Sequence, residues 1–183
     1  MMDLSFNHSL ASGYHSGSQI SRVLTEDWMA RNMFCPVCGA PMLGHYKANK
    51  LVADFFCNGC RSVFELKNKQ SKTAVVSNKI ADDTYTTMIE KITSFCNPHL
   101  FVMTYANWQV NNLLLIPNYF FVPDIIEKRP PLKETARLTG WIGYKIEIGN
   151  IPKRYSSSRI IDKKKNCIWL SCTKEHCLFK LRE

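Results

Sequence analysis

Four cysteines form two Cys-x-x-Cys pairs with the spacing of a metal site. Cys35 and Cys38 make the first pair, Cys57 and Cys60 make the second, and 18 residues separate the pairs. Two cysteines three positions apart can turn a tight loop that points both sulfurs at one ion, and two such loops complete a tetrahedron. A redox Cys-x-x-Cys and four unrelated core cysteines are the alternatives. The presence of two facing pairs favours a closed, structural zinc site.

The residues around these pairs carry further expectations. Gly39 follows the first pair and Gly59 lies inside the second, where tight turns favour a positive φ. His45 lies between the pairs and has a weak case as an extra ligand, because four thiolates already fill a zinc ion. The other cysteines are expected to be ordinary thiols, with a second metal site that includes His176 as the alternative. They are Cys96, Cys167, Cys172 and Cys177.

Two acidic residues and a lysine flank the second cysteine pair. Asp54 interrupts an apolar stretch. Eleven residues later comes Glu65, and Lys67 follows it two positions further on, in a run where apolar and charged residues alternate. Alternation along a strand puts Glu65 and Lys67 on one face. If the two stretches pair as a hairpin with the cysteines at its tip, Asp54 lies beside Glu65.

This trio has the composition of a phosphodiester-cleaving site. Asp54, Glu65 and the backbone carbonyl of Leu66 offer oxygen ligands to Mg²⁺, which accepts phosphate oxygens and keeps several waters. A metal there polarises the phosphodiester and lowers the pKa of a bound water. Lys67 can orient that water, help to take its proton or stabilise the developing charge. An exposed strand with alternating charges would contain the same residues, so that alternative stays open.

The elements that must position these residues are those of a mixed α/β domain. Helical spacing of apolar residues begins at Ser18, and Thr25 is a candidate cap for a second short helix. A second helix is expected over 82–95, capped by Asp82 or Asp83. Residues 1–16 are expected to form an arm, and the proline-rich stretch 117–135 a loop with short helical turns. Strands are expected over 51–56, 63–67, 100–105, 113–116 and 141–148.

Composition and charge restrict the class of protein. The 183 residues are 45% apolar and 21% charged, which is typical of one globular domain and excludes a disordered chain. Residues 1–127 carry 10 basic and 10 acidic side chains, whereas residues 128–183 carry 14 basic and 5 acidic ones. That excess predicts a nucleic-acid partner or, alternatively, a solvated basic face. No secretory signal or membrane span is recognisable, so a bacterial cytoplasmic location is expected.

Ten short stretches that run in order over residues 15–155 carry a family resemblance. They are Leu24-Thr-Glu-Asp-Trp28, Cys35-Pro-x-Cys38-Gly39, Val52-Ala-Asp-Phe55, Cys57-Asn58-x-Cys60, Phe64-Glu-Leu-Lys67, Asn97-Pro98, Thr104-Tyr105, Val110-Asn-Asn112, Thr135-Ala-Arg137 and Gly140-Trp-Ile-Gly143. On these residues the chain resembles the catalytic domain of the DpnI-like, Dam-replacing family of restriction endonucleases.

The resemblance implies a PD-(D/E)xK nuclease domain over residues 1–155, with a mixed sheet and a zinc-binding segment at 35–60. It implies a Mg²⁺-dependent type II endonuclease that cuts duplex DNA at GATC when the adenine is methylated. Asp54, Glu65 and Lys67 become the catalytic set, and the four paired cysteines become zinc ligands. Arg137 and Trp141 fall in a stretch that meets DNA in this family. Lys128, Arg129, Lys133, Arg137 and Lys145 are expected to neutralise phosphates.

Two departures from the family pattern set the alternatives. Ala53 replaces the proline that normally precedes the first acid, a mild change because only the acid is a ligand. Residues 156–183 are expected to be a basic tail, too short for the winged-helix domain of the family. The main alternative to an endonuclease is therefore an inactive or truncated zinc-containing module that binds methylated DNA. A zinc-ribbon interaction protein is a third hypothesis, and a monomer is the favoured oligomeric state. Two alternatives to DNA contact also stay open: Trp141 as a buried anchor for its loop, and Arg137 as a plain surface charge.

Overall fold

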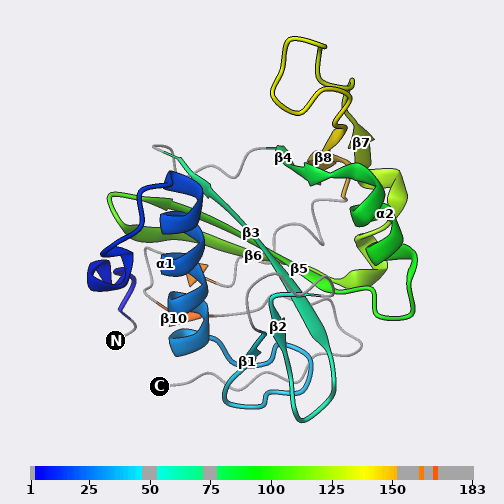
Figure 1. Ribbon diagram of the computed structural model, residues 1–183. Coiled ribbons are helices and arrows are strands. Elements are labelled where there is room, and N and C mark those ends of the chain that lie inside the picture. The colour runs from blue at the N-terminus through cyan, green and yellow to red at the C-terminus, as the bar shows by residue number, and fades with distance from the viewer. Residues whose placement is uncertain (1–2, 47–52, 72–77, 152–160, 163–166, 169–183) are drawn as a thin grey trace.

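A computed structural model describes residues 3–46, 53–71 and 78–151 and the short segments 161–162 and 167–168 (Figure 1). For residues 82–83 and for the two short segments, only the backbone is described. No helix in these parts of the chain is long and apolar enough to cross a membrane.

The centre of the molecule is a five-stranded mixed sheet with the order β1-β2-β3-β5-β6. Only the β3–β5 pairing is parallel, and the other neighbours are antiparallel. A parallel pair needs a crossover, and β4 and α2 lie in the segment that makes it. The strands are β1 Gly44–His45, β2 Phe55–Phe56, β3 Val63–Gln70, β5 His99–Ala106 and β6 Gln109–Ile116.

Two apolar cores cover the two faces of this sheet. On β5, Phe101 and Met103 pack into one core, and Leu100 and Val102 pack into the other. That alternation is the period-2 geometry of a strand that is buried on both faces. Helix α1 (Gly17–Asn32) supplies Leu24, Trp28 and Met29 to the first core, whereas α2 (Tyr85–Thr93) supplies Met88 and Ile92 to the second. The two helices therefore lie on opposite sides of the sheet (Figure 1).

A second, three-stranded antiparallel sheet packs with α2. Its order is β4-β8-β7. The strands are β4 Lys79–Thr84, β7 Ile126–Lys128 and β8 Gly143–Glu147, and 3₁₀ turns occupy Asn118–Phe120, Pro123–Ile125 and Ile148–Asn150. Residues 129–142 connect β7 to β8 as a loop that projects from the rest of the molecule, at the top of Figure 1.

Three expectations about elements are wrong in informative ways. Helix α1 is continuous, and Thr25 lies buried within it, where its hydroxyl donates to the Ser21 carbonyl one turn back (2.8 Å). The second helix begins at Tyr85 after a Thr84 cap, because Asp82 and its neighbours continue strand β4 and pair with β8. Strand β7 falls in the stretch expected to be loop, where pairing with β8 overrides the weak local signal.

The two ends of the described chain add small elements. The expected N-terminal arm contains a 3₁₀ turn at His8–Ala11, and Ser5 bridges to Gln109 at the end of the β5–β6 hairpin. In the tail, β9 (Ile161–Asp162) pairs with β10 (Cys167–Ile168). Most of the basic residues counted in 128–183 lie in 152–160, 163–166 and 169–183, outside the described residues. Three members of the hypothetical second metal site, Cys172, His176 and Cys177, also lie outside the described residues.

Candidate functional site

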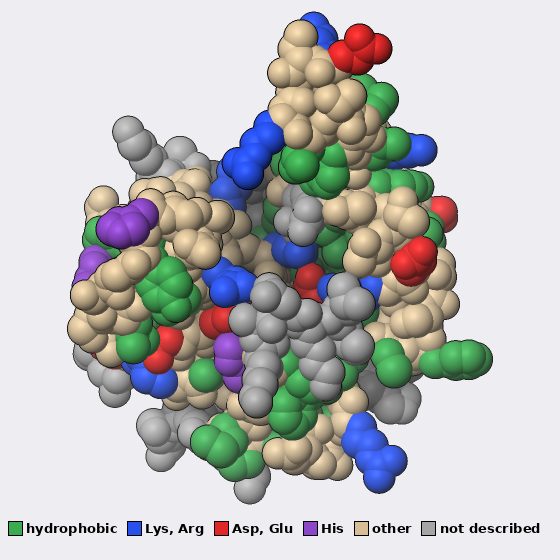
Figure 2. Space-filling model, in the orientation of Figure 1, with side chains coloured by type: hydrophobic (Ala, Val, Ile, Leu, Met, Phe, Trp, Pro, Cys, Tyr) green, Lys and Arg blue, Asp and Glu red, His purple; other side chains and the backbone are tan. Residues whose placement is uncertain are grey.

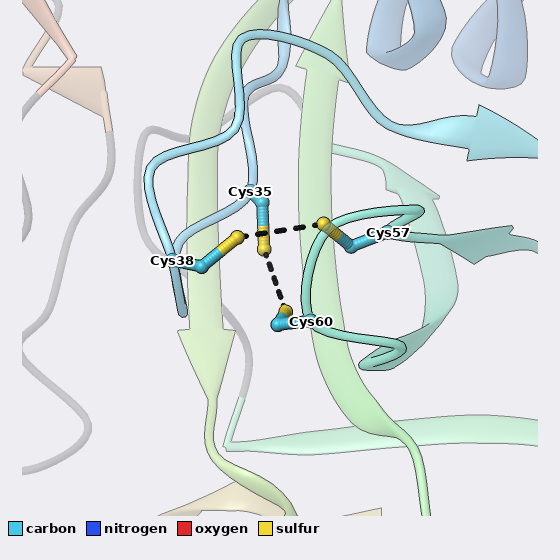
Figure 3. A group of neighbouring side chains, drawn as sticks. All are labelled: Cys35, Cys38, Cys57 and Cys60. Carbon is cyan, nitrogen blue, oxygen red and sulfur yellow. Dashed lines mark hydrogen bonds between the residues drawn. The ribbon is translucent and has the colours of Figure 1, made fainter.

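The two Cys-x-x-Cys pairs converge on one point at the tip of the β2–β3 hairpin (Figure 3). Their four sulfur atoms all lie within 4.8 Å of one another. Sγ of Cys35 is 3.6 Å from Sγ of Cys60, and Sγ of Cys38 is 3.5 Å from Sγ of Cys57. Zinc–sulfur bonds of about 2.3 Å place tetrahedral sulfurs about 3.8 Å apart. The four cysteines therefore have the spacing of a group that could bind zinc.

Both pairs are built on the same backbone turn. In the first, the Gly39 N–H donates to the Cys35 carbonyl (2.8 Å); in the second, the Arg61 N–H donates to the Cys57 carbonyl (2.9 Å). Gly39 and Arg61 both have positive φ, at 76° and 62°. The expectation that Gly59 takes a positive φ is therefore wrong, and Arg61 carries that conformation. An L-residue at positive φ is strained and persists only where its surroundings fix it, and here the bond from the Arg61 N–H to the Cys57 carbonyl closes the turn.

The thiols of the cluster differ in their electrostatics. Burial raises the pKa of the Cys35 thiol well above its ordinary value. Burial also acts to raise the pKa of Cys60, but hydrogen bonds with Ser62 and with the Cys38 and Cys35 side chains together outweigh it and lower that pKa to about 7. The Gly59 N–H points at Sγ of Cys57 (3.3 Å). A backbone N–H donor of this kind stabilises a thiolate, the form that binds metal.

The base of the same hairpin brings Asp54 to Glu65, as the sequence predicts. Phe55 pairs with Phe64 across β2 and β3, so the residues on either side of that pair are neighbours. Asp54 Oδ2 accepts a hydrogen bond from the Leu66 N–H at 2.6 Å. Because the N–H and C=O of one strand residue point to the same edge, the Leu66 carbonyl faces the same edge of β3 as Asp54.

Glu65 is buried between two lysines. Its side chain is 6% exposed, and Oε1 lies 3.0 Å from Nζ of Lys67 on the same face of β3. The second oxygen, Oε2, lies 3.0 Å from Nζ of Lys91, which comes from α2. Burial of a carboxylate is unfavourable unless ionic partners of this kind accompany it. The trio of Asp54, Glu65 and Lys67 is thus brought together, and a second lysine joins it.

Asp54 is held in an environment that resists its negative charge. Burial and the adjacent Glu65 carboxylate raise the pKa of Asp54 to about 6, and the Leu66 N–H and Lys67 oppose the rise only in part. Two neighbouring carboxylates that repel one another are a usual feature of divalent-cation sites, because the cation removes the repulsion.

These residues line an open cleft of about 520 Å³ (Figure 2). Among the described strands, β2 pairs only with the first two residues of β3, so the edge of β3 beyond Glu65 faces the cleft. The space-filling view shows the hollow between the α1 side and the lobe with the projecting loop, with acidic and basic side chains both inside it. The lining includes Arg22 and Glu26 from α1, Asp54, Glu65 to Gln70 from β3, and Ile80 and Ala81 from β4.

A polar network fixes α1 against β3 beside the cleft. The Ser21 hydroxyl contacts Asn68 Oδ1 (2.5 Å) and the Tyr105 hydroxyl (2.8 Å). Asn68 Nδ2 donates to Thr25 Oγ1 (3.2 Å). These bonds join the helix to the two strands that carry and support Glu65 and Lys67, so the wall of the cleft is fixed relative to its floor.

His45 faces the cleft wall and not the cysteine cluster. Its Nε2 lies 3.1 Å from Oε2 of Glu26, and its ring lies against Phe55 (5.0 Å between centroids). Burial raises the pKa of Glu26, and the charges of His45 and Arg22 oppose that rise. Among the described residues, the metal-capable group contains only cysteines, so His45 is not a fifth ligand.

The expected DNA-contacting residues lie on or beside the projecting loop. Lys133 and Arg137 are exposed on it. Trp141 is half-buried at its base, and its Nε1 donates to Thr84 Oγ1 (3.2 Å), which is the anchoring arrangement left open above. Lys145 lies on β8 and pairs with Glu127 (3.5 Å), so an acidic neighbour partly offsets its charge.

The nearby basic and polar residues have similar internal partners. Nζ of Lys128 lies 5.3 Å from the centre of the Tyr85 ring. The backbone of Arg129 is fixed, because its main-chain N–H donates to the Gly143 carbonyl (2.9 Å). Asn112 is buried in β6, where it donates to Thr104 Oγ1 (2.8 Å). These contacts are structural, and none requires a ligand.

Two residues at the site were not predicted: Lys91, which contacts Glu65 from α2, and Glu26, which lines the cleft. Lys91 stands at a polar position of an amphipathic helix, where a lysine normally indicates a solvated face. Glu26 belongs to an acidic pair that resembles a helix-capping signal. Neither position carries a local pattern that could have revealed its role, because packing of α1 and α2 against the sheet brings both to the site.

One comparison with known protein families matches almost the entire chain. The model of the DpnI family, described as the Dam-replacing family, matches residues 2–173. The match covers all four paired cysteines and every residue of the cleft. It also continues past residue 155, where the recognisable motifs end.

Proposed function

Because the chain belongs to the DpnI, or Dam-replacing, family, we propose that it is a Mg²⁺-dependent type II endonuclease acting on duplex DNA. Membership of this family indicates a methyl-directed, restriction-type nuclease. The finer proposal is that the chain uses a PD-(D/E)xK site and cuts at GATC sequences whose adenine is methylated.

One observation carries this proposal: the β2–β3 hairpin brings two carboxylates and a lysine to one open edge. Asp54 accepts a hydrogen bond from the Leu66 N–H (2.6 Å), and Glu65 contacts Lys67 (3.0 Å), inside an open cleft of about 520 Å³. A sheet gains no stability from gathering these charges in one place. Their convergence is explained by a divalent cation and an anionic substrate.

The residues fit a hard cation with oxygen ligands. Asp54 and Glu65 would supply carboxylate oxygens and Leu66 its carbonyl. When bound, Mg²⁺ polarises a phosphodiester and makes its own water more acidic. Lys67 would leave Glu65 to donate an N–H to a non-bridging phosphate oxygen, which stabilises the charge that develops as the bond to the leaving oxygen breaks.

Zinc has a separate, structural role in this proposal. The cysteine cluster is closed by four protein ligands, whereas catalytic zinc keeps an open position. Zinc would hold the tip of the hairpin whose base carries Asp54 and Glu65. It would thereby set the register of β2 on β3, and a one-residue slip would turn Glu65 away from the cleft.

The projecting loop would meet the DNA. Lys133 and Arg137 are exposed on it and available to phosphates or base edges. The methyl group of N6-methyladenine lies in the major groove, where an apolar ring can cover it. Trp141 would cover this methyl group with its ring. The side chain is only half-buried, and its hydrogen bond to Thr84 uses only Nε1, so other ring atoms stay accessible.

A plasmid digest tests the proposal directly. Zinc-loaded protein with Mg²⁺ should cut a plasmid that is adenine-methylated at GATC and leave the unmethylated plasmid intact. Asp54→Ala and Lys67→Ala should abolish the cut, because they remove a metal ligand and the phosphate contact. Asp124→Ala and Lys79→Ala are matched controls on exposed residues outside the cleft and should cut normally.

The opposite results are equally clear. Cutting by Asp54→Ala would refute the assigned site, and equal cutting of both plasmids would refute methyl direction. Absence of cutting by folded, zinc-loaded wild type, with salt-dependent binding to methylated DNA, would favour the non-cleaving module.

A further inference from the structure

Glu65 is the only acidic side chain that is buried among the residues the structure describes. Its two oxygens are taken by two different lysines, each at 3.0 Å: Lys67 on Oε1 and Lys91 on Oε2. The side chains of both lysines are themselves largely covered, at 16% and 13% exposed. A carboxylate divided between two covered lysines is held in one orientation.

The two lysines reach Glu65 from different elements. Lys67 is on the same strand face as Glu65 and lines the cleft. Lys91 reaches Oε2 from α2, and the buried residues Met88 and Ile92 on either side of it anchor that helix to the core. Lys67 therefore stands at the cleft, whereas Lys91 belongs to a helix that is fixed by its packing on the core.

We propose that Lys91 is a positioning residue of the divalent-cation site, and this rests on the proposed function. Lys91 holds Oε2 of Glu65 and so presents Oε1 to the cation. Lys67 is the lysine that the cation displaces from Oε1, which frees its ammonium group for the phosphate. One lysine orients the ligand, and the other exchanges places with the metal.

Charge balance gives this division a measurable consequence. Asp54, Glu65, Lys67 and Lys91 together sum to zero at neutral pH when both acids are ionised. Without Lys91, the buried Glu65 keeps Lys67 as its ammonium partner and attracts it more strongly, because an unpaired buried carboxylate is unfavourable. A cation must then displace a more tightly held lysine from a carboxylate that is free to rotate. Loss of Lys91 should therefore weaken cation binding, although it also removes a positive charge.

The test measures Mn²⁺ binding to the full-length, zinc-loaded chain by isothermal titration calorimetry, without DNA. Lys91→Met should raise the Mn²⁺ dissociation constant about 10-fold or more, the usual effect of removing a group that orients a metal ligand. Lys91→Arg retains a donor for Oε2 and should bind nearly as wild type does. Lys79→Met removes the same charge from an exposed ion pair and should leave the affinity unchanged.

A second variant serves if Lys91→Met does not fold. Lys91→Gln keeps a polar end in the pocket but ends one bond short of Glu65, and it should weaken Mn²⁺ binding in the same way. Thermal unfolding and zinc content identify which variants are folded. If either folded variant binds Mn²⁺ as tightly as wild type or more tightly, the positioning role is wrong.

Cleavage distinguishes positioning from catalysis. In Lys91→Met, excess Mg²⁺ should restore most of the cleavage rate, whereas no Mg²⁺ concentration should restore Lys67→Ala. If the wild type does not bind Mn²⁺, the cation site does not exist, and both proposals are refuted. Wild type that binds Mn²⁺ with the expected Lys91 dependence but cuts no DNA would refute only the proposed function.

Discussion

The β2–β3 hairpin carries two clusters of like groups, one at its tip and one at its base. At the tip, four thiols lie within 4.8 Å of one another. At the base, Asp54 and Glu65 lie side by side and repel each other enough to raise the pKa of Asp54 to about 6. The tip is closed by its own ligands, whereas the base opens into a cleft of about 520 Å³.

The difference shows how one hairpin could provide two kinds of metal site, as the proposed function requires. Ligands that come from two tight local turns saturate an ion and leave nothing for a substrate, which suits a structural role. Ligands on an open strand edge, supported by lysines from the strand and from a distant helix, leave coordination positions for water and phosphate. The site at the tip is closed by residues near one another in the sequence, which suits a role in stability. The site at the base is left open and is completed by tertiary packing, which suits the proposed chemistry.

The largest expected effect is at the tip. Cys57→Ser removes one of the four candidate zinc ligands and should prevent folding at ordinary temperature, because zinc binding to such a site would supply folding free energy. Circular dichroism and metal analysis would measure this, with about one zinc per chain expected for wild type. Cys96→Ser changes an exposed thiol outside the cluster and should behave as wild type. A folded, zinc-free Cys57→Ser protein would abolish the contrast between tip and base.

At the base, the same kind of substitution should stabilise the fold. Asp54→Asn removes a charge that the folded protein holds at a pKa of about 6, against an ordinary 3.8. The wild-type stability from this group is present below about pH 4 and is lost as the pH rises through about 6. Above that pH, without added Mg²⁺, the variant should gain as much as ~3 kcal/mol in free energy of unfolding while losing cleavage.

Urea unfolding of both proteins at pH 3.5 and pH 7.5 would measure that gain. The two stabilities should agree at the lower pH and diverge at the higher one. A variant that is less stable than wild type at both values would show that the base is a structural ion cluster like any other.

The pH dependence of cleavage should reflect the same group. In the proposed site Mg²⁺ would bind the ionised Asp54 carboxylate, so cleavage at limiting Mg²⁺ should decline as the pH falls below about 6. Because cation and proton compete for the carboxylate, a higher Mg²⁺ concentration should move the decline to lower pH. Initial rates over a pH series at two Mg²⁺ concentrations measure this shift. If the pH of the decline does not depend on the Mg²⁺ concentration, a group other than Asp54 controls the pH dependence.

The smallest expected effect concerns the loop. Arg137 is exposed, whereas Lys145 is already paired with Glu127. Arg137→Ala should reduce the salt dependence of DNA binding by about one phosphate contact, and Lys145→Ala by less. Fluorescence anisotropy with methylated duplex at several salt concentrations would test the order. The reverse order would mean that DNA binds along β8.

The tip of the hairpin could be predicted almost completely from the sequence, because its geometry is local. The spacing of Cys35, Cys38, Cys57 and Cys60 defines the cluster without reference to the rest of the fold. Even there, the second turn places its positive φ at Arg61 and not at Gly59. A glycine marks a place where such a turn is easy, but the hydrogen bonds decide where it falls.

The base could be predicted only in part. Strand alternation and the hairpin were sufficient to place Asp54 beside Glu65 and Lys67. Lys91 could not be found in this way, because it lies 26 residues from Glu65 and reaches it only through the packing of α2. Likewise, β7 has little strand signal of its own and forms because β8 offers a partner.

The parallel pairing of β3 with β5 has a consequence for the order of assembly. As the chain is synthesised, its first 67 residues already contain the four paired cysteines and the trio of Asp54, Glu65 and Lys67. These groups close short loops, whereas β5 must wait for the crossover segment and then for a slow non-local pairing. We therefore expect the zinc-bound hairpin to fold on the nascent chain first. Lys91 would arrive last, when the crossover docks, so that the acidic edge becomes competent only in the finished protein.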